Sequence, residues 1–167
     1  GLRALAVTLV VLYHLWPERL AGGYVGVDVF FVISGYLITS HMLREIDRTG
    51  SIALIRFWAR RVRRLLPAGF AVLLASVAIL FWFIPASSVR QNLSEIVASA
   101  FYVENWFLAA STVDYLAADN AASLVQHYWS LSVEEQFYIV WPLLVLIALV
   151  ISRRTRMNAR TGLLLIL

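Results

Sequence analysis

The chain has 167 residues, of which 61% are hydrophobic and only 14% are charged. Soluble domains average about 45–50% apolar and about 25% charged residues, and a chain of this length must leave much of its surface in water. The composition therefore excludes a soluble globular domain and predicts an integral membrane protein. The absence of cysteine excludes disulfides and thiolate metal ligands, and no metal site is predicted.

The formal net charge is +4, and every basic residue is an arginine. The arginines occur in short blocks between apolar runs, a placement typical of membrane topology. No nucleic-acid partner is therefore predicted.

The first half of the chain contains three apolar runs, and a spanning helix needs about 20 mostly apolar residues. Residues 4–16 predict a short or truncated first span, which ends near Pro17. Residues 24–42 predict a second span. An arginine-rich connection over 44–64 follows, and the alternation within 52–66 predicts an amphipathic interfacial helix there.

The second half contains two more apolar segments and one ambiguous region. Residues 65–84 predict a clean span, and residues 130–151 predict another, followed by an arginine cluster over 153–160. Residues 93–110 are apolar but carry two glutamates and an asparagine, so a helical segment at the outer face, or a re-entrant one, is expected there.

Basic residues next to spans favour the cytoplasmic side, so 44–64 and 153–160 are both expected there. By parity, 85–126 then contains either no span or two. Both chain ends look cut, because an apolar run begins almost at Gly1 and another begins at Gly162. We therefore expect a fragment of a larger membrane domain.

Arg3 and His14 are separated by eleven positions. On an α-helix this spacing gives about 20° of offset and about 16 Å of rise, so both side chains lie on one face. Ionisable groups in a span are costly and usually face a cavity or a partner, and histidine exchanges a proton near neutral pH. A snorkelling arginine with a hydrogen-bonded interfacial histidine explains the same spacing.

Asp28 follows closely spaced glycines that permit a tight turn or a close helix approach. It predicts either a polar contact inside the membrane or a simple charge at a helix N-terminus. Ser34 lies about two turns further on and is suited to packing against a neighbouring helix.

Five arginines crowd the segment before Pro67. Guanidinium groups bind phosphates through paired hydrogen bonds, but cytoplasmic loops also attract arginine and bind anionic lipid. The block consists of Arg56, Arg60, Arg61, Arg63 and Arg64.

The stretch from His127 to Pro142 places Glu134, Glu135 and Gln136 in an apolar, aromatic-rich span. Neighbouring helical positions differ by about 100°, so the two glutamates cannot share a face. Aromatic belts explain the tyrosines and tryptophans but not two carboxylates.

At these residues the sequence resembles the membrane acyltransferase-3 family of O-acyltransferases. The resemblance is carried by four blocks in the family's order, with Asn105-Trp106 ahead of the fourth. The blocks are Arg3 to His14, Gly26 to Gly35, the set Arg60, Arg61, Arg64 and Pro67, and Trp129 to Tyr138.

The resemblance implies an all-α, polytopic transmembrane helix bundle of about ten spans, of which this chain is the first half. It implies a multi-pass enzyme of the cell membrane that moves an acyl group, usually acetyl, from cytoplasmic acyl-CoA to a hydroxyl of an extracytoplasmic glycan or glycolipid. Acyl-CoA would be a donor substrate and not a tightly bound cofactor. Membrane lipid would surround the bundle, and some relatives carry an added SGNH-type domain.

The predicted site combines the residue patterns described above with what the family resemblance implies. His14 is the predicted base and Glu134 its supporting carboxylate, while Arg3 and Asp28 contact substrate or pair along its path. The predicted donor-phosphate ligands are Arg60, Arg61 and Arg64, and the predicted supporting residues are Ser34, Asn105, Trp129, Ser130 and Gln136.

Two other functions remain compatible with the residues. A transporter subunit would use His14, Asp28 and Glu134 as an intramembrane path, and a non-catalytic membrane scaffold is the third alternative. The arginine block distinguishes the acyltransferase from these two alternatives, because only an acyl-CoA enzyme needs phosphate ligands there.

Overall fold

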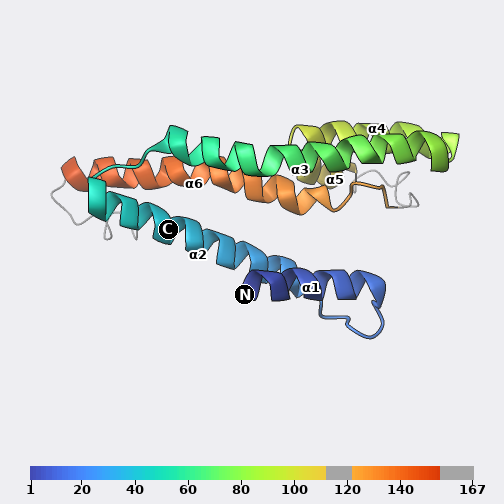
Figure 1. Ribbon diagram of the computed structural model, residues 1–167, viewed down its shortest axis with the longest axis horizontal. Coiled ribbons are helices and arrows are strands. Elements are labelled where there is room, and N and C mark those ends of the chain that lie inside the picture. The colour runs from blue at the N-terminus through green and yellow to red at the C-terminus, as the bar shows by residue number, and fades with distance from the viewer. Residues whose placement is uncertain (112–121, 155–167) are drawn as a thin grey trace. The chain divides into compact units, whose positions relative to one another are not determined.

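The computed structural model describes residues 1–111 and 122–154 (Figure 1). Within these ranges the chain is helical and contains no strand, which confirms the predicted all-α class. The helices are α1 (Leu2–Leu15), α2 (Val25–Thr49), α3 (Leu54–Phe83), α4 (Ala86–Ala100), α5 (Glu104–Ser111) and α6 (Tyr128–Arg154).

Three of these helices, α2, α3 and α6, are long and apolar enough to cross a membrane. They correspond to three of the four predicted spans, and they confirm the prediction of a membrane protein. The fourth predicted span corresponds to α1, which is apolar but has only 14 residues.

The chain divides into two compact units, Gly1–Ile52 and Ala53–Leu167. In the first unit α1 packs along α2. In the second, α3 packs against α4 and α6, and the short α5 packs against α6 (Figure 1). The core of the second unit is formed by the buried side chains of Leu73, Leu80, Ile96, Val125 and Tyr128.

The predicted connection over 44–64 was wrong in its extent. Helix α2 continues to Thr49 and ends at Gly50, whose φ of 73° is the left-handed conformation that glycine tolerates at a helix C-terminus. Only residues 50–53 separate α2 from α3. The separate interfacial helix predicted over 52–66 does not form, because α3 runs unbroken through Pro67.

Among the described residues between α3 and α6 there are two helices, α4 and α5, and neither is a candidate span. Residues 112–121 and 155–167 lie outside the described part of the chain, and with them Arg156, Arg160 and the last apolar run. The number of spans between 85 and 127 therefore stays a prediction.

Candidate functional site

Two glycines bring the backbones of α1 and the start of α2 into close approach. A Cβ added to Gly26 would lie 2.4 Å from the carbonyl oxygen of Ala6, and one added to Gly23 would lie 2.6 Å from that of Leu9. Neither position has room for a side chain. Gly23 and Gly26 therefore serve helix packing, which was one of the two roles predicted for the glycines ahead of Asp28.

Arg3 lies in this α1–α2 contact. Its guanidinium donates to the Oγ of Ser34 at 2.7 Å and lies over the ring of Phe30, with Cζ 5.1 Å from the ring centroid. The Nε–H of Arg3 is buried and has no hydrogen-bond partner within the described residues. The structure thus joins two predicted site residues, Arg3 and Ser34, and leaves one donor of the guanidinium uncommitted.

His14 lies near the end of α1 with an exposed side chain. Its Nδ1 is 2.8 Å from the carbonyl oxygen of Val10. A carbonyl oxygen can only accept, so this contact places a proton on Nδ1, and in the neutral ring Nε2 then has the lone pair. Tyr13 contacts the imidazole edge-on, with ring centroids 5.3 Å apart. The ring is therefore held in the tautomer in which Nε2 can accept a proton.

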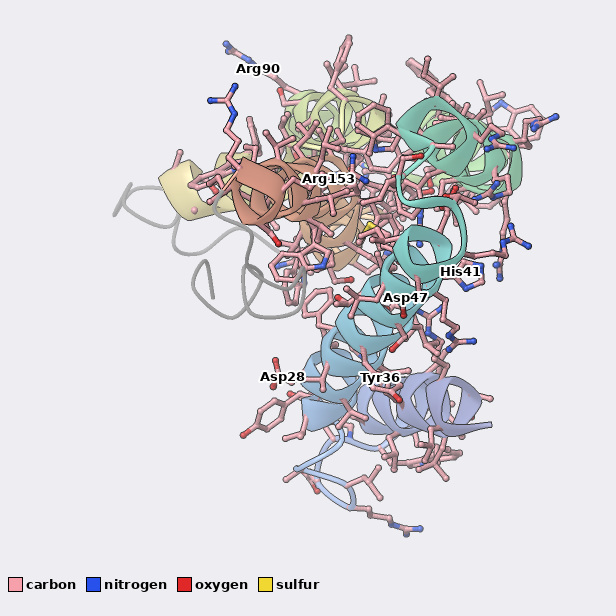
Figure 2. All side chains as sticks on the ribbon, turned by 90° about the vertical axis from the view of Figure 1, so that its left-hand side faces the viewer. Asp28, Tyr36, His41, Asp47, Arg90 and Arg153 are labelled. Atoms are coloured by element: carbon pink, nitrogen blue, oxygen red, sulfur yellow. The ribbon has the colours of Figure 1, made fainter. Side chains whose placement is uncertain are left out.

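Asp28 lies in the first turn of α2, where a carboxylate interacts favourably with the helix dipole. Its side chain is exposed and projects away from the helices (Figure 2). This position agrees with the simpler of the two interpretations, a charge at a helix N-terminus.

The arginine block occupies the first turns of α3, and its members point in different directions. Arg60 and Arg64 are exposed, whereas Arg61 is partly buried against α6. The Cζ atom of Arg61 lies 4.7 Å from the ring centroid of Phe57 and 3.5 Å from that of Tyr138. Only the exposed members present their full charge to water.

Glu134 is 7% exposed and accepts a hydrogen bond from the hydroxyl of Tyr138, one turn further along α6. Glu135 is less deeply buried, but its Oε1 is enclosed and has no partner within the described residues. It also interacts electrostatically with Arg61. Because His14 belongs to the other compact unit, the predicted pairing of Glu134 with His14 stays a prediction.

Gln136 and Asn105 form a reciprocal amide pair between α6 and α5. The Nε2 of Gln136 donates to the Oδ1 of Asn105 at 2.9 Å, and the Nδ2 of Asn105 donates to the Oε1 of Gln136 at 3.2 Å. Gln136 also donates to the carbonyl of Tyr102 at 2.8 Å and accepts from the indole of Trp106. Tyr102 has a φ of 56°, so this network holds a strained turn.

The remaining two predicted residues lie at the start of α6. Trp129 is 38% exposed, and Ser130 donates to the carbonyl of His127 at 3.1 Å. They join Gln136 in the second unit, whereas Arg3, His14, Asp28 and Ser34 belong to the first.

Comparison with known proteins assigns the family. The chain matches the family model described as "Acyltransferase domain" over residues 1–167. The chain belongs to this acyltransferase family. No solved structure gives a significant match.

Several curated relatives carry O-acetyltransferase names. A Staphylococcus aureus (strain COL) protein named "Putative O-acetyltransferase" is 46% identical over 159 residues, which cover 95% of this chain and 26% of that protein. The "Peptidoglycan O-acetyltransferase OatA" of Listeria monocytogenes (strain EGD-e) is 43% identical over 150 residues, covering 89% of this chain and 24% of that protein. The chain thus spans about a quarter of the length of these relatives.

The structure of this acyltransferase-family chain also shows polar residues that the sequence argument missed. Tyr138 bridges Arg61 and Glu134. Its carbonyl accepts from the indole of Trp58 at 2.9 Å. The available signal was Pro142, because a proline within a helix leaves the carbonyl four residues earlier without its helical donor. That carbonyl belongs to Tyr138.

A second missed feature lies between α4, α5 and the segment before α6. Glu95 is 2% exposed, accepts from Gln91 at 3.0 Å and accepts from the hydroxyl of Ser123. Glu104 is fully buried, and neither of its oxygens has a hydrogen bond of normal geometry within the described residues. Burial and the nearby Glu95 raise the pKa of Glu104 to about 8, so its carboxyl is protonated at neutral pH.

Proposed function

We propose that the full-length protein containing this chain is a multi-pass O-acetyltransferase of the cell membrane. It would transfer an acetyl group from cytoplasmic acetyl-CoA to a hydroxyl of an extracytoplasmic glycan. Membership of the acyltransferase family and the names of the relatives support this reaction. Because one relative is named for peptidoglycan, that glycan is the first acceptor to test.

The observation that carries the proposal is the contact of the His14 Nδ1 with the carbonyl oxygen of Val10. Its Nδ1–H is committed to the carbonyl of Val10, and its exposed ring presents Nε2 as a base. An alcohol attacks a thioester effectively only while a base removes its proton, and a positioned base contributes roughly 10²–10⁴ in rate.

The proposed reaction balances without a further reactant. The acceptor oxygen forms a bond to the acetyl carbonyl carbon as its proton passes to Nε2 of His14. The carbon–sulfur bond then breaks, and the proton on Nε2 passes to the departing CoA thiolate. His14 returns to its starting tautomer, and the products are an acetyl ester and CoA.

The other residues of the proposed site stabilise charges that this reaction creates or brings in. Glu134 would favour the cationic form of His14, as a carboxylate near an imidazolium does. Arg60 and Arg64 are exposed and can bind the donor phosphates through paired hydrogen bonds, with Arg61 at the inner edge of the block. Arg3 would contact the donor through its uncommitted Nε–H.

Replacement of His14 by alanine tests the base. We expect His14→Ala in the full-length protein to abolish acetyl transfer, while membrane insertion and acetyl-CoA binding persist. The matched control is His41→Ala, because His41 is also an exposed histidine (Figure 2). The measurement is the acetate that mild base releases from purified peptidoglycan. Substantial transfer by a folded His14→Ala protein would exclude this histidine as the base.

Replacement of the exposed arginines tests the donor site separately. Arg60→Ala combined with Arg64→Ala should weaken acetyl-CoA binding by the membrane-embedded protein, because two phosphate ligands are lost. Arg90→Ala removes an exposed arginine from α4 and should leave binding unchanged (Figure 2). If the wild type, the double variant and Arg90→Ala bind acetyl-CoA with equal affinity, the arginine block only sets the orientation of the helices in the membrane.

A further inference from the structure

Arg61 differs from its neighbours in the arginine block because its side chain is turned towards α6. Its Cζ lies 3.5 Å from the ring centroid of Tyr138 and 4.7 Å from that of Phe57. A cation over aromatic faces is attracted most strongly where water is excluded, and Tyr138 is only 3% exposed. The position of Arg61 is therefore set by the ring of Tyr138.

The other end of Tyr138 fixes Glu134. The phenol hydroxyl donates to this buried carboxylate from one helical turn away. A hydrogen bond to an ionised group is about twice as strong as one between neutral groups. One side chain thus contacts a member of the proposed donor site through its ring and the proposed catalytic carboxylate through its hydroxyl.

The backbone of Tyr138 is anchored as well. Pro142 has no N–H to give to the carbonyl of Tyr138, and the indole of Trp58 donates to that oxygen at 2.9 Å. Trp58 and Arg61 are three positions apart on α3, so they share a face of that helix. The same helix face therefore fixes both the backbone and the ring of Tyr138.

We propose that Tyr138 is a positioning residue that links the donor arginines to the catalytic carboxylate. Its ring sets Arg61 at the inner edge of the arginine block, and its hydroxyl sets the orientation of Glu134. This role rests on the proposed function, because that function assigns the block to donor binding and Glu134 to turnover.

Substitution can separate the effect of the Tyr138 ring from the effect of its hydroxyl. Tyr138→Phe keeps the ring under Arg61 and removes the hydrogen bond to Glu134, so kcat should fall about tenfold or more while KM for acetyl-CoA stays within about twofold. Tyr138→Leu also removes the aromatic face, so KM for acetyl-CoA should rise in addition, by about tenfold. A residue that only fills space would show no such division between kcat and KM.

The matched control is Tyr128→Phe in the same helix. Tyr128 is 4% exposed, and its hydroxyl donates to the carbonyl of Gly69 at 2.8 Å, so this variant also loses a buried tyrosine hydrogen bond, here to a neutral acceptor. It should lower thermal stability and leave both kinetic constants unchanged.

All variants would be assayed in the full-length protein in membranes, with labelled acetyl-CoA as donor and isolated peptidoglycan as acceptor. If Tyr138→Phe keeps the kcat of Tyr128→Phe, or if Tyr138→Leu keeps the wild-type KM, the positioning role is overturned. Failure of the donor assignment itself would show differently, because the Arg60 and Arg64 substitutions would then leave KM unchanged while the effect of Tyr138→Phe on kcat persisted.

Discussion

The helices inside each of the two compact units are packed against one another by different kinds of contact. In the first, α1 and α2 approach so closely at Gly23 and Gly26 that no side chain fits between their backbones. In the second, polar side chains cross between helices to backbone carbonyls, as Tyr128 does to Gly69 and Trp58 does to Tyr138. The first unit relies on glycines at its closest backbone contact, whereas the second has hydrogen-bond donors that reach backbone carbonyls of a neighbouring helix.

The polar side chains of the two units also differ in their surroundings. In the first unit packing uses glycine, so the side chains of His14 and Asp28 remain exposed. In the second unit Glu134 and Gln136 are held in internal hydrogen bonds. Substitutions should therefore separate stability from activity cleanly in the first unit, whereas in the second most polar substitutions should affect both.

The largest loss of stability should follow from a side chain added at Gly26. In Gly26→Val the Cβ alone would meet the carbonyl oxygen of Ala6 at 2.4 Å, so the two backbones must separate. We expect a loss of about 3 kcal/mol or more. Gly22→Val is the control, because a Cβ there has nothing within 4 Å. Thermal unfolding in detergent would compare them, and equal melting temperatures would refute the close-approach argument.

Much of the fold was predictable because lipid imposes a simple length rule on apolar runs. The predicted spans over 65–84 and 130–151 correspond to parts of α3 and α6. The error over 44–64 arose because arginines and Pro67 are usual signs of a loop. Both α2 and α3 instead carry their helical hydrogen bonding through polar segments, and residues 50–53 alone form the connection.

The candidate site was predictable in its residue types but not in its contacts. Spacing placed Glu134 and Glu135 on different sides of α6, and their different burial agrees with this. The partner of Arg61 could not be predicted, because a ring on a helix 77 positions away leaves no local pattern. Pro142 was the one readable sign of a contact at Tyr138.

The second largest effect should appear as a pH dependence in the second unit. The pKa of Glu104 is about 8 in the folded protein, raised by burial and by Glu95, against an ordinary value of 4.5. The folded state therefore holds a proton that the unfolded state loses, and this contribution to stability is complete below about pH 4.5 and declines as pH rises to about 8. The slope is at most about 1.4 kcal/mol per pH unit.

Glu104→Gln removes this titration while keeping the shape of the side chain. Its melting temperature should change little between pH 5.5 and 8.5 and should exceed that of the wild type at pH 8.5. Glu18→Gln, at an exposed position, should retain the wild-type profile. An unchanged slope in Glu104→Gln would assign the pH dependence to other groups.

A smaller effect is expected from the amide pair that joins α5 to α6. Gln136→Leu leaves the carbonyl of Tyr102 and the amide of Asn105 without a side-chain partner, and it releases a turn whose φ is 56°. A fully buried group left unsatisfied costs about 1–3 kcal/mol, and these groups are only partly buried, so a loss of about 1 kcal/mol for each group is expected. The control is Gln126→Leu at an exposed position, which should be close to neutral in thermal unfolding. Equal losses in both variants would show that the pair contributes nothing specific.

The smallest effect tests the bond between Trp58 and Tyr138, through a pair of substitutions. Trp58→Phe removes the indole N–H from the carbonyl of Tyr138 and should cost about 1–2 kcal/mol, because Pro142 supplies no helical donor to that oxygen. In a Pro142→Ala background the alanine N–H can make the ordinary helical bond instead. The cost of Trp58→Phe should then fall to the small packing difference between indole and phenyl rings. The difference between the two costs, measured by thermal unfolding of all four proteins, is the coupling between proline and indole. A coupling near zero would mean that Trp58 contributes packing alone, and that the second unit depends on apolar contact at this point.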